Sequence, residues 1–91
     1  MAKELILTGI VQGVFCRKYC SDNARKLGLK GGVSNLSNGT VRVILDTDSE
    51  EIIAKYISVL KQNPFGYRFY GRIDNVSVAN YSGTIRGDYV F

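Results

Sequence analysis

A glycine-containing turn constrains the fold of this chain more than any other feature. The apolar run at residues 5–7 reads as a strand that enters the turn, Gly9 and Gly13 lie within it, and an amphipathic pattern follows. Glycine adopts backbone conformations that a side chain would forbid. The turn can therefore aim several consecutive N–H groups at one point, just where a helix begins. Such a row of amides predicts a site for an anion of the size of phosphate.

Arg17 falls in the first turn of the predicted helix. Its guanidinium is a planar, permanently charged fork of donors that would strengthen an anion site there. The alternative is a glycine turn from strand to helix that binds no ligand.

Hydrophobic periodicity and turn signals predict the remaining elements. Gly28 is placed to end the first helix, Asn38-Gly39 is a strong hairpin signal, and Asp48 with Glu51 three positions later is a capping-box-like helix start. Asn63-Pro64 ends the second helix, because the residue before proline avoids the helical region. The predicted elements are strands at 3–9, 30–35, 40–46, 72–80 and 89–91, a helix at 16–27, and a helix whose apolar stripe runs over 52–60.

This order is β-α-β-β-α-β with a short C-terminal strand. Right-handed crossovers place both helices on one face of a single antiparallel sheet. We therefore expect an α+β, ferredoxin-like sandwich. Its 91 residues are enough for one core, and we expect residues 1–91 to form one domain.

Composition excludes several kinds of site. The chain has no His, which removes the usual general base and any Ser-His or Cys-His nucleophile pair. Cys16 and Cys20 are four residues apart on one helix face, a spacing that suits reduced core residues better than a zinc site. No apolar run approaches the roughly 20 residues of a membrane span. The N-terminus lacks a secretory h-region, so we expect a cytoplasmic protein. The net charge of +4 suits an anionic ligand.

Two motifs resemble signatures of the acylphosphatase family. Residues 9–17 read GIVQGVFCR, which matches six of the seven fixed positions of G-x-V-Q-G-V-x-F-R, with Cys16 where the family usually has Phe. Residues 31–35 read GGVSN and precede Asn38-Gly39, which is similar to the family's G-W-V-x-N followed by a D/N-G turn, with Gly32 in place of Trp. The resemblance extends over the whole chain and implies the ferredoxin-like fold of a small free-standing enzyme.

The resemblance implies hydrolysis of the mixed anhydride of a carboxylic acid and phosphate. Arg17 and Asn35 would be catalytic, Arg17 on the phosphoryl oxygens and Asn35 on the attacking water. The implied phosphate-binding loop consists of Gln12, Gly13, Val14, Phe15, Cys16 and Arg17. An asparagine orients water but is too weak a base to deprotonate it, so positioning and charge stabilisation would do most of the work.

No metal or cofactor is needed for such a reaction. We expect the partners of the chain to be a small-molecule acyl phosphate, with inorganic phosphate or sulfate as product or mimic, and we expect a monomer. The anion site would recognise only the phosphoryl group, so the sequence does not identify the acyl group.

Two other function classes are compatible with the sequence. The departures at Cys16 and Gly32 are compatible with a non-catalytic module that binds an anion or a protein partner. The positive charge and the aromatic residues interleaved with Arg at residues 65–72 resemble a single-stranded nucleic-acid platform. RNA-reading modules of this fold carry their aromatic residues on central strands, where this chain has no such motif. We therefore expect the rings of 65–72 to pack over the sheet edge, with no nucleic-acid partner.

Overall fold

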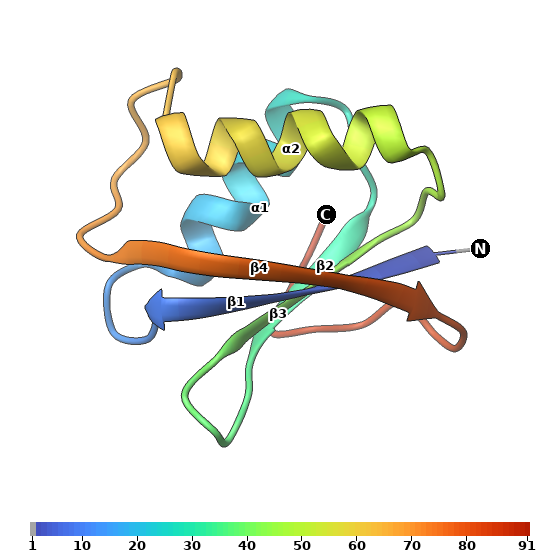
Figure 1. Ribbon diagram of the computed structural model, residues 1–91, viewed down its shortest axis with the longest axis horizontal. Helices are drawn as coiled ribbons and strands as arrows, with labels where there is room; N and C mark the ends of the chain where they lie inside the picture. The colour runs from blue at the N-terminus through green and yellow to red at the C-terminus, as the bar shows by residue number, and fades with distance from the viewer. Residues whose placement is uncertain (1) are drawn as a thin grey trace.

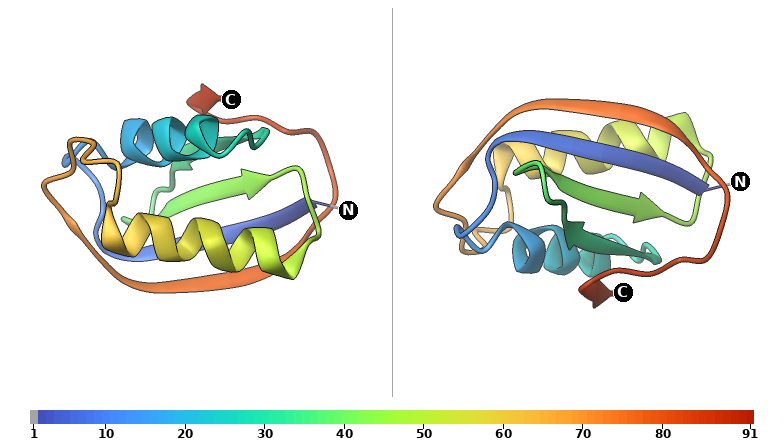
Figure 2. Two further views of the ribbon diagram at one scale, coloured as in Figure 1. Left: turned by 90° about the horizontal axis from the view of Figure 1, so that it is seen from above. Right: turned by 90° about the horizontal axis from the view of Figure 1, so that it is seen from below.

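The computed structural model describes residues 2–91, which form one sheet covered by two helices (Figure 1). Both helices lie side by side on the same face of the sheet (Figure 2). The elements in chain order are β1 (Ala2–Ile10), α1 (Cys16–Lys26), β2 (Gly31–Asn35), β3 (Val41–Leu45), α2 (Glu50–Gln62), β4 (Arg72–Tyr81) and β5 (Tyr89–Val90).

The sheet has the strand order β4-β1-β3-β2-β5, and every neighbouring pair is antiparallel. This arrangement confirms the predicted ferredoxin-like α+β fold with its added C-terminal strand. Each predicted strand is present within one or two residues of its expected bounds. Neither helix within residues 2–91 has the length and hydrophobicity that crossing a bilayer requires.

Alternation in the central strands builds the core under the helices. Leu5 and Leu7 of β1 are fully buried, as are Val41, Val43 and Leu45 of β3. Side chains alternate between the two faces of a strand, so each of these sets lies on the face that the helices cover.

Two buried tyrosines connect the helices to each other. Tyr19 of α1 donates its hydroxyl hydrogen bond to the carbonyl of Leu60 at 2.7 Å, and Tyr56 of α2 donates to the carbonyl of Cys20 at 2.8 Å. Burial raises the pKa of Tyr19 to about 12 and also raises the pKa of Tyr56. Each ring fills the core while its hydroxyl finds a partner, as buried tyrosines require.

The start of α2 corrects one detail of the prediction. Ser49, not Asp48, is the N-cap, and its side chain accepts from the backbone N–H of Ile52 at 3.4 Å. With the cap one residue later, Ile52 occupies the position where a capping box needs Glu or Gln, so no reciprocal bond forms. The helix ends at Gln62, and its C-cap Asn63 adopts a left-handed conformation with φ of 50°.

The C-terminal tail lies directly against β2. Strand β5 pairs with β2 at Gly32 and Val33. A Cβ on Gly32 would approach the carbonyl oxygen of Arg86 to 2.4 Å, and a Cβ on Gly87 would approach the backbone nitrogen of Val33 to 2.6 Å. The space that a side chain at Gly32 would need is therefore filled by the chain's own backbone.

Candidate functional site

The loop between β1 and α1 contains two residues with left-handed backbone conformations. Gly13 has φ of 74° and Phe15 has φ of 64°. A bulky residue in the left-handed region is uncommon and is often associated with a functional site. Phe15 is the N-cap of α1 and offers no side-chain acceptor. The first N–H groups of a helix have no intrahelical partner, and the helix dipole makes this end positive, so the loop favours an anion.

Gln12 fixes this loop to the neighbouring hairpin. Its side-chain Nε2 donates to the carbonyl of Leu36 at 2.7 Å and to the carbonyl of Thr40 at 2.9 Å. Both carbonyls belong to the turn between β2 and β3, which the Asn38-Gly39 signal predicted. Gln12 therefore shapes the loop and has its amide hydrogens occupied by the backbone.

Arg17 projects from the first turn of α1 toward the C-terminal tail. Its Nη1 lies 2.9 Å from Oδ2 of Asp88, and its guanidinium carbon lies 5.7 Å from the centroid of the Tyr89 ring. A guanidinium carries five N–H donors, so one contact to Asp88 leaves donors for a bound anion. The side chain is 39% exposed, which leaves it accessible to a ligand.

Asn35 lies at the end of β2, facing the same region. Its backbone N–H donates to Oδ2 of Asp88 at 3.2 Å, whereas its side-chain Oδ1 is buried and has no hydrogen-bond partner among the described residues. A buried acceptor without a partner costs free energy, and such atoms are rare in folded proteins.

A cavity of about 260 Å³ brings these groups together. Its lining includes Arg17 and Asn35, which are far apart in sequence. The other lining residues are Val11, Gly13, Phe15, Cys16, Lys18 and Tyr89. Of the predicted phosphate-loop residues, Gly13, Phe15, Cys16 and Arg17 line the cavity. Gln12 and Val14 are not among its lining residues.

Asp88 is the residue that the sequence analysis missed. One carboxylate oxygen of Asp88 accepts hydrogen bonds from the backbone N–H of Asn35 and from the guanidinium of Arg17. The Asn35 hydrogen bond has the larger effect, and together the two lower the pKa of Asp88 below its usual range. Asp88 is part of no motif and is distant in sequence from both partners. Only the pairing of β5 with β2 brings it to the site.

The departure at Cys16 leaves the start of α1 intact. Cys16 is the first helical residue and is 2% exposed, with its sulfur 3.8 Å from that of Cys20. Arg17 therefore stays in the first turn, and Cys16 behaves as the small buried hydrophobe that the spacing predicted. Among residues 2–91, no cluster of three His, Cys, Asp or Glu residues is arranged to hold a metal ion.

The aromatic loop between α2 and β4 packs against the core for part of its length, and its stacking contact is with helix α1. Phe69 stacks on the buried Tyr19 with ring centroids 4.6 Å apart, and Tyr67 also packs against the core. Tyr70 does not, and its ring remains 69% exposed.

Comparison with known proteins agrees with this geometry. The sequence model of the acylphosphatase family matches residues 3–89. An acylphosphatase of Corynebacterium glutamicum is 42% identical over 71 residues, which cover 75% of this chain and 71% of that protein. An acylphosphatase of Leuconostoc mesenteroides is 33% identical over 79 residues, covering 87% of this chain and 83% of that protein.

Solved structures extend the similarity to three dimensions. The crystal structure of an acylphosphatase from Bacillus subtilis has a TM-score of 0.70 at 26% identity and covers 94% of this chain and 93% of its own. An acylphosphatase from Coxiella burnetii has a TM-score of 0.63 at 26% identity. Fold, loop and sequence match together over nearly the full length, and this chain belongs to the acylphosphatase family.

Proposed function

We propose that this protein hydrolyses the carboxyl-phosphate anhydride of small acyl phosphates to a carboxylate and phosphate. One observation carries the proposal: the first residues of α1, Arg17 and Asn35 line one cavity. The named acylphosphatases to which the chain is similar support the same reaction.

In the proposed mechanism, the loop amides and Arg17 bind the oxygens of the phosphoryl group. Preorganised donors of this kind stabilise the charge of the transition state, and phosphoryl transfer depends mainly on such positioning. A water molecule donates a hydrogen bond to Oδ1 of Asn35, which directs the lone pair of the water oxygen at phosphorus. The P–O bond to the acyl group breaks as the bond to water forms. The carboxylate departs without needing a proton, one water proton passes to a phosphoryl oxygen, and the other stays on the oxygen that has bonded to phosphorus.

The proposal requires neither metal nor cofactor. We further propose that the protein is a cytoplasmic monomer and that residues 1–91 form one domain. The loop between β1 and α1 would also bind inorganic phosphate or sulfate. Sedimentation equilibrium and calorimetric titration with phosphate test the oligomeric state and the anion site separately.

The decisive experiment is hydrolysis of benzoyl phosphate in EDTA by the wild type, Arg17→Ala and Asn35→Ala. We expect turnover in EDTA, with kcat lowered about 10²- to 10³-fold in each variant, the usual range for loss of one stabilising donor. Arg17→Ala should also lose phosphate binding, whereas Asn35→Ala should keep it.

The controls replace a surface cation and a surface asparagine away from the cavity. Lys55→Gln on the outer face of α2 and Asn75→Ala on β4 should retain wild-type turnover. A folded wild type that binds phosphate but turns over no substrate would instead establish a non-catalytic anion-binding module.

A further inference from the structure

A second cavity adjoins the proposed phosphate site. It has a volume of about 250 Å³ and is lined by Phe15, Lys18, Asp22, Tyr67 and Arg68. Phe15 and Lys18 line both cavities. A ligand whose phosphoryl group lies on the loop therefore meets these two side chains where the two cavities adjoin.

Phe15 forms a wall of both cavities, and a planar cation and a second aromatic ring contact it. The guanidinium carbon of Arg68 lies 5.5 Å from the centroid of the Phe15 ring, and the ring of Tyr70 meets Phe15 edge-on at 5.7 Å. Phe15 nevertheless remains 49% exposed. Large aromatic side chains left this open beside a cavity are characteristic of ligand contact.

The segment that carries these walls is held firmly against the phosphate loop. The backbone N–H of Tyr70 donates to the carbonyl of Val14 at 3.2 Å. The Asn63 side chain both donates to the Tyr67 carbonyl and accepts from the Tyr67 N–H, at 2.9 and 3.0 Å. Figure 2 shows the segment after α2 meeting the loop after β1 at one end of the molecule. The second cavity is thus a preformed part of the same site.

The charges around this cavity are already engaged. Lys18 is paired with Asp22 at 2.9 Å, and the Arg68 guanidinium lies over an aromatic ring. The walls therefore offer flat, polarisable faces, and a carboxylate at the far end of a ligand would have to compete for these cations. Flat faces suit an aromatic ring, which gains from ring–ring and cation–π contacts.

We propose that the second cavity is the acyl subsite of the enzyme and that it selects substrates with an aromatic acyl group. Phe15 and Arg68 are its specificity-determining residues. The inference rests on the proposed acyl phosphate hydrolysis, because it assigns the part of the substrate that the phosphate loop leaves unrecognised.

The test compares kcat/KM for benzoyl phosphate with kcat/KM for acetyl phosphate. For the wild type we expect a ratio of about ten, the order that one additional aromatic contact supplies. Arg68→Gln and Phe15→Leu should each lower this ratio about threefold or more. The inhibition constant of inorganic phosphate is measured in each variant as a check on the phosphate loop. For Arg68→Gln this constant should equal that of the wild type.

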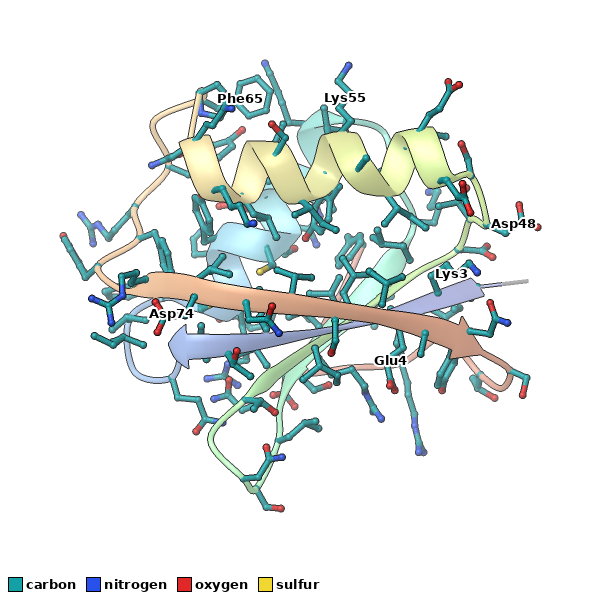
Figure 3. All side chains as sticks on the ribbon, in the orientation of Figure 1. Lys3, Glu4, Asp48, Lys55, Phe65 and Asp74 are labelled. Carbon is teal, nitrogen blue, oxygen red and sulfur yellow. The ribbon has the colours of Figure 1, made fainter. Side chains whose placement is uncertain are left out.

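The control variants are an exposed aromatic residue and a surface cation outside both cavities. Phe65 also has a cation over its ring, Lys26 at 5.7 Å, and Lys55 points outward from α2 (Figure 3). Phe65→Leu and Lys55→Gln should keep the wild-type ratio. An unchanged ratio in folded Arg68→Gln and Phe15→Leu overturns the subsite, as does a ratio that falls equally in the controls.

A binding measurement separates failure of the subsite from failure of the enzyme proposal. Benzylphosphonate carries an aromatic group and methylphosphonate carries a methyl group, and their binding can be measured without any hydrolysis. The wild type should bind benzylphosphonate more tightly, and Arg68→Gln should reduce that preference. If the protein shows this preference but hydrolyses no acyl phosphate, the enzyme proposal is wrong and the subsite stands. If it hydrolyses acyl phosphates but shows no preference, the subsite is wrong and the enzyme proposal stands.

Discussion

At the scale of single residues, the site depends on a carboxylate that belongs to no motif. Oδ2 of Asp88 accepts from the side chain of Arg17 and from the backbone N–H of Asn35. Arg17 is long and 39% exposed, so without this contact its guanidinium would sample many rotamers. Asp88 is therefore a positioning residue, which limits the motion of one proposed catalytic side chain and ties it to the strand that carries the other.

We predict that Asp88→Ala lowers kcat about tenfold, because small misplacements of an orienting group are costly in catalysis. Asp88→Asn should lose less, since its side-chain oxygen can still accept from both donors. Steady-state kinetics of both variants, with unfolding curves to confirm their folding, measure the effect. Equal and unchanged kcat in the two variants would contradict a positioning role.

The pH dependence of the same contact has a definite sign. The pKa of Asp88 is lower in the folded protein than the value of about 3.9 for a free aspartate. The contact is therefore complete above about pH 4 and is lost as the pH falls through the folded pKa. The positioning effect should accordingly be constant from pH 5 to pH 8, and an Asp88→Ala defect that varied across this range would require another titrating group.

At the scale of secondary-structure elements, the close pairing of β5 with β2 brings Asp88 to the site. Two glycines make that pairing possible, because Gly32 and Gly87 face backbone atoms that leave no room for a Cβ. The glycine that replaces the family's tryptophan thus accommodates this chain's own tail. At Gly32, β2 pairs with both β3 and β5, so the ladder is intact at the departure from the family motif.

Gly32→Ala is predicted to displace the tail, since its Cβ would lie 2.4 Å from the Arg86 carbonyl oxygen. We expect a loss of about 1–3 kcal/mol in unfolding free energy, as for other overpacked positions, together with a kcat close to that of Asp88→Ala. Urea denaturation and kinetics check the two effects. Gly87→Ala creates an independent clash with Val33 and should reproduce both. Wild-type stability and activity in both variants would show that the tail is not held as described.

At the scale of the whole molecule, the buried tyrosines couple both helices over the sheet. Tyr19 is 1% exposed and Tyr56 is fully buried, and each hydroxyl reaches a carbonyl of the opposite helix. The site is built on the first turn of α1, so the position of this helix over the sheet sets the position of the phosphate loop. Core packing and site geometry are therefore linked through α1.

The raised tyrosine pKa values predict loss of stability in alkali. An unfolded tyrosine ionises near pH 10, whereas Tyr19 in the folded protein has a pKa of about 12. Its contribution is fully present below about pH 10 and is lost as the pH rises toward 12. Urea unfolding from pH 9 to pH 12 should show a falling free energy of unfolding. The decline should be shallower in Tyr19→Phe, and an identical slope in both proteins would contradict the assignment.

Local physics alone determined much of this protein. Periodicity and turn residues predicted the order of the elements and the glycine turn before the first helix, because these depend on residues a few positions apart. The handedness of the crossovers then predicted one antiparallel sheet. The Ser49 cap was misplaced by one residue, since neighbouring Asp and Ser are both good caps and sequence does not rank them.

Only the tertiary structure decided how the site is completed. The contact of Asp88 with Arg17 spans 71 positions in the chain, and the second cavity requires the segment after α2 to lie against the loop after β1. Neither arrangement has a local signal, because each results from strand pairing and packing between distant segments. The sequence alone therefore predicted a phosphate-binding turn, and the fold supplied the carboxylate that contacts Arg17 and the residues that line the second cavity.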